Sequence, residues 1–217
     1  MKQKNILLIW DRIGDYHLAR VKACEEILPG AVYTADLAGS DALYKWDSIA
    51  HPNHTILSKK PAEQRDIVNR FRAFRNIIKN NNIGFVAMPY GRTDYHLFLL
   101  YAKLIGVRTL IFSESWYSRG KVKDFLKAIL LKVLGDSFFA SGERAYTHFA
   151  ATYKINPDKI KKGYSVVDNA HFKKRIVTAG KYLLCIARYS EEKNLSFLIQ
   201  CYAKSAIREK YLSLIHI

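Results

Sequence analysis

The residues best suited to chemistry lie in turns that link an apolar, strand-like segment to a helix-like segment. The turn at 186–194 places Arg188 and Lys193 on either side of a tight bend that leads into a helix. A departing diphosphate gains negative charge as its bond breaks, and two fixed cations beside a helix N-terminus would stabilise that charge. Solvated surface charge is the alternative interpretation, but the position of the pair favours a diphosphate site.

A second turn, Asp-Arg-Ile-Gly-Asp-Tyr-His at 11–17, follows the first apolar segment of the chain. Gly14 would let the backbone approach a ligand closely. The turn lacks the GxGxxG pattern, which disfavours a dinucleotide-binding enzyme. His17 is a candidate for binding a hydroxyl group or handling a proton.

The tetrapeptide Asp-Tyr-His-Leu occurs at 15–18 and again at 94–97, each time where a helix should begin. Asp15 and Asp94 are therefore predicted to be N-caps. The repeat would place His17 and His96 in one cleft as hydroxyl-binding or proton-handling groups; a purely structural role is the alternative for both.

Glu114 lies in a third turn, Ser-Glu-Ser-Trp, directly after the apolar segment 107–112. A carboxylate at the end of a strand could bind or polarise a hydroxyl group of a substrate. Capping of the next helix, or pairing with Arg119, is the alternative. Glu114 and His17 are the candidate catalytic residues.

The elements that must position these turns alternate along the chain between apolar strand lengths and helical periodicity. Such alternation predicts βαβ units, and hence an α/β, Rossmann-like parallel sheet with helices on both faces. Ligands bind at the carboxyl ends of the strands in such sheets, where the turns lie. The predicted strands are 5–10, 31–37, 55–57, 83–88, 107–112 and 137–140, and the predicted helices are 18–28, 62–79, 95–105, 121–134 and 143–153.

A second α/β series begins late in the chain, with a strand at 182–187 and a helix at 195–202. We predict an N-terminal domain at 1–162, a linker at 163–180 and the start of a second domain at 181–211. The residues 212–217, Leu-Ser-Leu-Ile-His-Ile, resemble translated adaptor sequence and are predicted to be a non-native tail.

The formal net charge of +16 indicates an anionic partner: nucleic acid, anionic lipid or a phosphorylated substrate. The three cysteines are unclustered and the seven histidines lack metal-binding spacing, so neither a disulfide framework nor a metal site is expected. With no segment long enough to span a membrane and no signal peptide, we expect a cytoplasmic protein.

The segment 119–134 combines an apolar helix face with basic residues around it. An ordinary buried helix is one interpretation, and peripheral docking on anionic lipid at the inner face of the cell membrane is the other. The apolar residues are Val122, Phe125, Leu126, Ile129, Leu130, Val133 and Leu134, and the basic residues are Arg119, Lys121, Lys123, Lys127 and Lys132.

Two segments resemble family-4 retaining glycosyltransferases. The segment 182–194, YLLCIARYSEEKN, is similar to the strand and Gly-Arg-x-x-x-Glu-Lys-Asn turn that open the family's donor domain, with Ala187 where the family usually has glycine. The segment 138–172 is similar to a family segment in which a strand leads through Ser-Gly and a helix to a Val-Asp-x-x-x-Phe crossover. Val167, Asp168 and Phe172 match this crossover. The details resemble a branch that builds bacterial surface polysaccharides.

The resemblance implies two Rossmann-like domains and sugar transfer with retention of configuration, without a metal or other cofactor. It implies that Arg188 and Lys193 bind the diphosphate of a sugar-nucleotide donor, with Gly14 closing over it. His17, His96 and Glu114 would then face a glycan or lipid-linked acceptor. The family's later acidic donor motif would lie beyond residue 217, so we expect a truncated fragment that is inactive by itself.

Two other functions fit the same sequence. A non-enzymatic nucleic-acid-binding protein would explain the charge but would need basic residues clustered with exposed aromatic residues. Because the aromatic residues here lie mainly in apolar faces, no nucleic-acid partner is expected. A sugar-nucleotide epimerase or a phosphorylase would share the two-domain fold.

Overall fold

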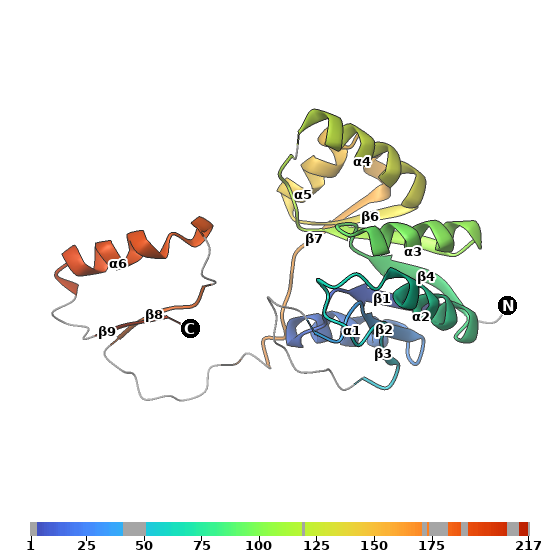
Figure 1. The fold of residues 1–217 in the computed structure, drawn as a ribbon, viewed down its shortest axis with the longest axis horizontal. Helices are drawn as coiled ribbons and strands as arrows, with labels where there is room; N and C mark the ends of the chain where they lie inside the picture. The colour runs from blue at the N-terminus through green and yellow to red at the C-terminus, as the bar shows by residue number, and fades with distance from the viewer. Residues whose placement is uncertain are drawn as a thin grey trace. The chain divides into compact units, whose positions relative to one another are not determined.

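The computed structural model describes residues 4–40, 51–118, 120–170, 173, 182–187, 191–207 and 213–216. The chain forms two compact units, residues 1–172 and residues 173–217 (Figure 1). The candidate pocket lies wholly within the first unit.

The first unit is built on a seven-stranded sheet in the order β3-β2-β1-β4-β5-β6-β7, with every pairing parallel. The predicted α/β, Rossmann-like fold is therefore confirmed. The strand β7, which the sequence did not predict, pairs with β6. The strands are β1 Asn5–Trp10, β2 Val32–Asp36, β3 His54–Ile56, β4 Ile83–Met88, β5 Arg108–Ser113, β6 Ser137–Ser141 and β7 Ile160–Gly163.

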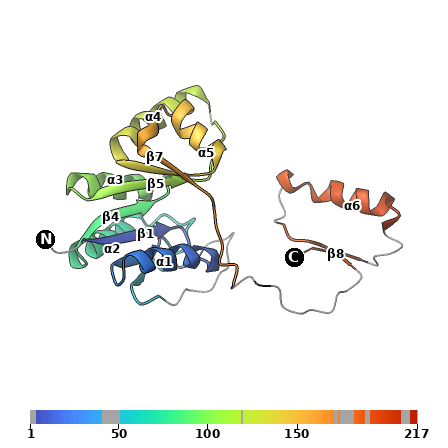
Figure 2. The same cartoon turned by 180° about the vertical axis from the view of Figure 1, so that it is seen from behind.

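The helices of this unit connect the parallel strands and flank the sheet (Figures 1 and 2). They are α1 Asp15–Ile27, α2 Ile67–Asn80, α3 Thr93–Leu104, α4 Lys121–Leu134 and α5 Glu143–Thr147. The predicted helix 143–153 is divided, because α5 continues as a π-helical turn at His148–Thr152. Among the helices that the structure describes, none has both the length and the apolar character needed to cross a membrane.

Alternate side chains of each strand point to opposite faces of the sheet, and each face has its own core. On one face Leu7 and Ile9 of β1 belong to a large cluster that includes side chains of α2, α3, α4 and α5. On the other face Leu8 packs in a smaller cluster that includes Val21 of α1. The second face is covered less completely, since Phe112 and Phe139 are only partly buried there.

The helix α2 begins at Ile67 rather than at the predicted residue 62. Phe74 and Ile78 are buried, and Arg70, although charged, is only 1% exposed. Its guanidinium Nη2 donates to the backbone oxygens of Pro61 (2.9 Å) and Gln64 (3.1 Å). The carboxylate of Asp94 also lies 3.6 Å from Arg70 Nη1. Together these contacts offset the burial of the charge, and the hydrogen bonds tie residues 61 and 64 to the helix.

The second unit contains β8 Tyr182–Cys185, a 3₁₀ turn at Glu191–Lys193, α6 Leu195–Lys204 and β9 Ser213–His216. The strand and helix predicted at 182–187 and 195–202 are present. β8 pairs in parallel with β9. Part of the segment predicted to be a non-native tail thus forms a strand beside β8.

Candidate functional site

The order of the strands places a crevice at the carboxyl ends of β1 and β4. These neighbours are not consecutive in the chain, so the connections leave them in opposite directions, and ligands bind at such a switch point in open α/β sheets. A pocket of about 610 Å³ lies here. Its walls include Trp10, Asp11, Arg12, Tyr16, His17, Arg20, Tyr90, Phe112, Glu114, Ser115, Ser141, His148 and Tyr164.

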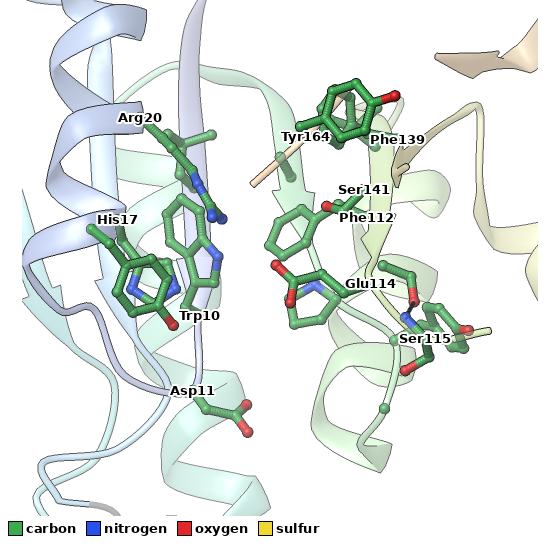
Figure 3. Close-up of a pocket in the computed structure, with 18 of the residues that line it drawn as sticks. Trp10, Asp11, His17, Arg20, Phe112, Glu114, Ser115, Phe139, Ser141 and Tyr164 are labelled. Carbon is green, nitrogen blue, oxygen red and sulfur yellow. Dashed lines mark hydrogen bonds between the residues drawn. The ribbon is translucent and has the colours of Figure 1, made fainter. Parts of the chain in front are cut away.

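Figure 3 shows how the pocket is walled. Trp10, His17 and Arg20 come from β1 and α1 on one side, and Phe112 and Glu114 come from the end of β5 on the other. The Trp10 ring lies 5.4 Å from that of Phe112 and 5.0 Å from that of His17, measured between centroids. Aromatic walls with a few polar groups are typical of small-molecule sites.

The turn after β1 is fixed by a buried ion pair. Asp36, at the end of β2, is fully buried and accepts a hydrogen bond from the backbone N–H of Ile13 (2.7 Å). Arg12 Nη1 donates to Asp36 Oδ2 (3.2 Å) and to the backbone oxygen of Gly39 (2.8 Å). Because the carboxylate holds both a side chain and the main chain, Asp36 sets where α1 begins.

The predicted N-caps are wrong in both repeats. The N-cap of α1 is Gly14 and that of α3 is Arg92, so Asp15 and Asp94 lie in the first helical turns. In α1 the cap is completed by His17, whose Nδ1 accepts a hydrogen bond from the N–H of Gly14 (2.9 Å). The side chain three positions into the helix satisfies a backbone donor that the helix itself leaves unpaired.

His17 is held neutral, and its tautomer follows from its cap. Burial, with the nearby charge of Arg20, lowers the pKa of His17 from 6.5 to about 3. Since Nδ1 accepts a hydrogen bond, the single ring proton is on Nε2. At neutral pH the ring can donate a hydrogen bond from Nε2 but is a poor base, which favours hydroxyl binding over proton handling.

Gly14 has little freedom to bind a phosphate directly. Its N–H is engaged by His17, and its carbonyl accepts from the N–H of His17 (2.8 Å) and of Leu18 (3.2 Å). Its φ of −114° does not require glycine. A role for Gly14 at the diphosphate stays a prediction, and it would require the Gly14–His17 hydrogen bond to open.

Glu114 lies in the pocket wall, as its place after β5 predicts. The side chain is exposed, and its Oε1 accepts a hydrogen bond from Ser165 Oγ (2.6 Å). Ser165 follows β7, so the carboxylate links the ends of two strands. The predicted pairing partner Arg119 lies outside the described residues.

His96 is close to the pocket but is not among the residues that line it. Its Nε2 lies 2.8 Å from the backbone oxygen of Tyr90, which is in the wall, so Nε2 carries a proton and donates. Burial lowers the pKa of His96, and the bond to Tyr90 opposes that shift. In this geometry His96 fixes the loop after β4, and its direct contact with an acceptor stays a prediction.

Three pocket residues were not assigned to the site from the sequence. Arg20 lies one helical turn after His17 on the same face of α1, a spacing that could have indicated it. Lys127 reaches the pocket from α4, with its Nζ 5.1 Å from the centre of the Tyr90 ring. His148 begins the π-helical turn, and no spacing in the sequence relates it to His17.

His148 is a buried polar residue of the pocket wall whose hydrogen bonding is incomplete. It is 5% exposed, and its Nε2 has no hydrogen-bond partner among the residues that the structure describes. Burial lowers the pKa of His148, Asp124 raises it, and Lys127 lowers it. A buried ring nitrogen beside the pocket is suited to a ligand hydroxyl, and π-helical turns occur frequently at functional sites.

The predicted diphosphate pair belongs to the second unit. Arg188 lies outside the described residues. Lys193 ends the 3₁₀ turn before α6, and its side chain is exposed. Within the described ranges, no group of three or more His, Cys, Asp or Glu side chains could hold a metal ion.

Solved structures share this fold. The chain is similar to a glycosyltransferase from Rickettsia africae ESF-5, with a TM-score of 0.61 and 15% identity over 100% of this chain and 68% of that protein. It is similar to a putative UDP-N-acetylglucosamine 2-epimerase from Listeria monocytogenes, with a TM-score of 0.60 and 11% identity over 100% of this chain and 63% of that protein. For S. aureus MnaA, determined with UDP, the TM-score is 0.60 at 15% identity, over 99% of this chain and 69% of that protein.

No protein-family model matches the sequence, and no curated protein matches it. At such low identities the structural similarity shows the fold alone. The chain is thus an α/β, Rossmann-like protein with a switch-point pocket, and it spans 63–69% of the length of these three structures.

Proposed function

We propose that this chain acts in sugar-nucleotide chemistry, as a glycosyltransferase that moves a sugar from a nucleotide donor to a glycan or lipid-linked acceptor with retention of configuration. The observation that carries this proposal is the switch-point pocket, which combines aromatic walls with Glu114, His17 and His148. Sugars present apolar C–H faces and hydroxyl groups, and this lining offers a partner to each. The folds of a glycosyltransferase and of a UDP-bound protein support it.

In this proposal the pocket of the first unit binds the acceptor. Glu114 accepts a hydrogen bond from the attacking hydroxyl and polarises it. His17 donates from Nε2 to a second oxygen, and the unpartnered Nε2 of His148 takes up a third polar contact. Arg20 supplies positive charge at the same wall.

The donor diphosphate would be bound by Arg188 and Lys193 of the second unit. As the bond between the sugar carbon and the phosphate oxygen breaks, the acceptor oxygen forms the new bond and its proton passes to Glu114. Negative charge collects on the departing diphosphate. The two cations would stabilise that charge. A bacterial, cytoplasmic setting and independence from metal are parts of the same proposal.

A sugar-nucleotide epimerase is the second candidate, favoured by the similarity to the L. monocytogenes protein. An epimerase needs no separate acceptor, because the sugar itself is altered and stays on the nucleotide. The two candidates therefore differ in what they form when a donor is supplied alone.

Nucleotide binding tests both candidates together. The full chain should bind UDP or another nucleoside diphosphate saturably in calorimetry, and Lys193→Ala should weaken binding, whereas Lys79→Ala, an exposed lysine on α2, should not. Absence of binding to any nucleoside diphosphate would overturn the proposal.

Product analysis then separates them. With UDP-N-acetylglucosamine as the probe and candidate acceptors present, NMR should show a new glycosidic bond of the same anomeric configuration as the donor. Formation of the 2-epimer without an acceptor would replace the transferase with the epimerase.

A further inference from the structure

We propose that helix α4 docks this protein on the surface of an anionic phospholipid bilayer. The helix is apolar on two opposite sides. Ala128, Leu131 and Leu134 are buried, at most 6% exposed, in the large core of the first unit. Leu130 is partly buried against the same core. The remaining large apolar side chains of α4 face outward, and an ordinary buried helix does not account for them.

The outward side of α4 is a continuous apolar stripe. Successive residues of a helix are rotated by about 100°, so positions 122, 125, 126, 129 and 133 fall within an arc of about 100°. The exposed fractions are 74% for Val122, 65% for Phe125, 61% for Leu126, 48% for Ile129 and 59% for Val133. Five large apolar side chains on one helix face form a patch that water does not favour.

Lysines border this stripe on both sides. By the same rotation, Lys121 and Lys132 lie on one flank and Lys123 on the other, each about a quarter-turn from the centre of the stripe. All three are exposed. The one acidic residue of α4, Asp124, is buried and accepts a hydrogen bond from Ser118, so α4 itself places no exposed carboxylate beside the lysines.

This arrangement fits a bilayer surface. A helix lying in the plane of the interface inserts its apolar face at the boundary between headgroups and acyl chains, and basic residues on its flanks contact anionic phosphates. Trp116 and Tyr117, in the segment just before α4, are 54% and 53% exposed. Such aromatic side chains are enriched at membrane interfaces.

The docking surface also bears on the candidate pocket. Lys127 comes from α4 and lines that pocket, so the helix that would contact the bilayer forms part of the pocket wall. Docking would bring the pocket close to the headgroups, where the head of a lipid-linked acceptor lies. The docking itself does not rest on the proposed function, because vesicle binding is measured without any sugar nucleotide.

The test is co-sedimentation of the full chain with vesicles of phosphatidylglycerol and phosphatidylcholine. The variant Lys121→Gln/Lys123→Gln/Lys132→Gln should bind on the order of 100-fold more weakly, because each basic residue near an anionic surface contributes about fivefold. Its control is Lys22→Gln/Lys79→Gln/Lys159→Gln, which removes three exposed lysines from other elements and leaves the same net charge. The control should bind like the unmodified chain.

The apolar stripe is tested in the same way. Phe125→Gln/Leu126→Gln/Ile129→Gln should also weaken binding on the order of 100-fold. Its control is Ile27→Gln/Val68→Gln/Leu104→Gln, since these apolar side chains are 79%, 65% and 77% exposed on other helices. All six substitutions are at exposed positions, and circular dichroism should show unchanged folding.

Three results would overturn the proposal. The first is the absence of binding to the anionic vesicles, and the second is an equal loss in a variant and its control. The third is a chain that does not bind vesicles but forms dimers, which the stripe variant abolishes. In that case the apolar stripe would contact a second copy of the chain. Binding that is equally strong to pure phosphatidylcholine would contradict the role of the lysines.

Discussion

Replacing His17 by glutamine should make the stability of the first unit less sensitive to acid. The His17 ring is neutral in the fold, because burial lowers its pKa to about 3, whereas the unfolded chain has the ordinary value of 6.5. As the pH falls below 6.5, the unfolded state gains a proton that the folded state does not take up. Stability contributed by neutral His17 is therefore complete above pH 6.5 and is lost progressively toward pH 3.

The expected size follows from linkage. Between pH 6.5 and about pH 5, proton uptake stabilises the unfolded state relative to the folded state by up to about 1.4 kcal/mol per pH unit. Protonation of His17 should therefore lower the free energy of unfolding by about 2 kcal/mol over this range. Glutamine at this helix position can still accept the Gly14 N–H through its side-chain oxygen, but it does not titrate. The His17→Gln variant should therefore lose about 2 kcal/mol less than the unmodified chain on the same acidification.

Urea unfolding at the two pH values measures this difference. All three tryptophans, Trp10, Trp46 and Trp116, precede residue 173 in the chain, so tryptophan fluorescence reports on the unfolding of the first unit. The variant His17→Ala separates the hydrogen bond from the titration. It does not titrate either, but it leaves the Gly14 N–H unpaired, so it should be about 1–3 kcal/mol less stable than His17→Gln at both pH values. Equal acid sensitivity in the unmodified chain and His17→Gln would show that His17 is not held neutral, and the reasoning about its tautomer would fail.

Three further predictions concern the turn after β1, the pocket and the proposed diphosphate site. Asp36→Ala should lower the free energy of unfolding by about 3–5 kcal/mol, because it leaves the buried Arg12 guanidinium without its carboxylate. The control in the same urea experiment is Glu143→Ala, which removes an exposed ion pair with Lys162 and should have little effect. Similar losses in the two variants would contradict the role of Asp36. Glu114→Gln should reduce sugar transfer by about 100-fold or more in a chain that turns over, with nucleotide binding unchanged by calorimetry; an unchanged rate would remove Glu114 from the chemistry. Lys193→Ala should weaken binding of a nucleoside diphosphate by about 10- to 100-fold, because the variant loses a hydrogen bond between charged groups. An unchanged affinity would show that the diphosphate binds elsewhere.

The alternation of apolar strands and helices was sufficient to predict the sheet and the turns at its edge. Five of the seven strands of the first unit, β1, β2, β4, β5 and β6, were predicted with bounds close to those found, because each is an apolar run of strand length between turn residues. β3 was predicted as a weak strand. β7, with two lysines among its four residues, has no apolar run, and only its pairing with β6 defines it.

The sequence also located part of the site, because the ends of parallel strands must meet at one edge. His17 and Glu114 line the pocket for that reason. The roles of single side chains depended on contacts that spacing does not specify. Asp36 anchors the turn after β1 from a different strand, and His148 joins the same pocket from more than 100 residues along the chain.

Which face of a helix is buried was likewise decided by the tertiary structure. The periodicity of α4 identified an apolar face but could not say whether it faces the core, and the packing buries Ala128 and Leu131 while leaving Phe125 and Leu126 exposed. Arg70 shows the reverse case: its charged side chain is buried, and the backbone oxygens of residues 61 and 64 accept hydrogen bonds from its guanidinium group. Local sequence determines which elements form, since hydrophobic periodicity and turn chemistry act over a few residues. Burial, protonation and the composition of a pocket depend on which distant segments pack together, and only the folded chain fixes that.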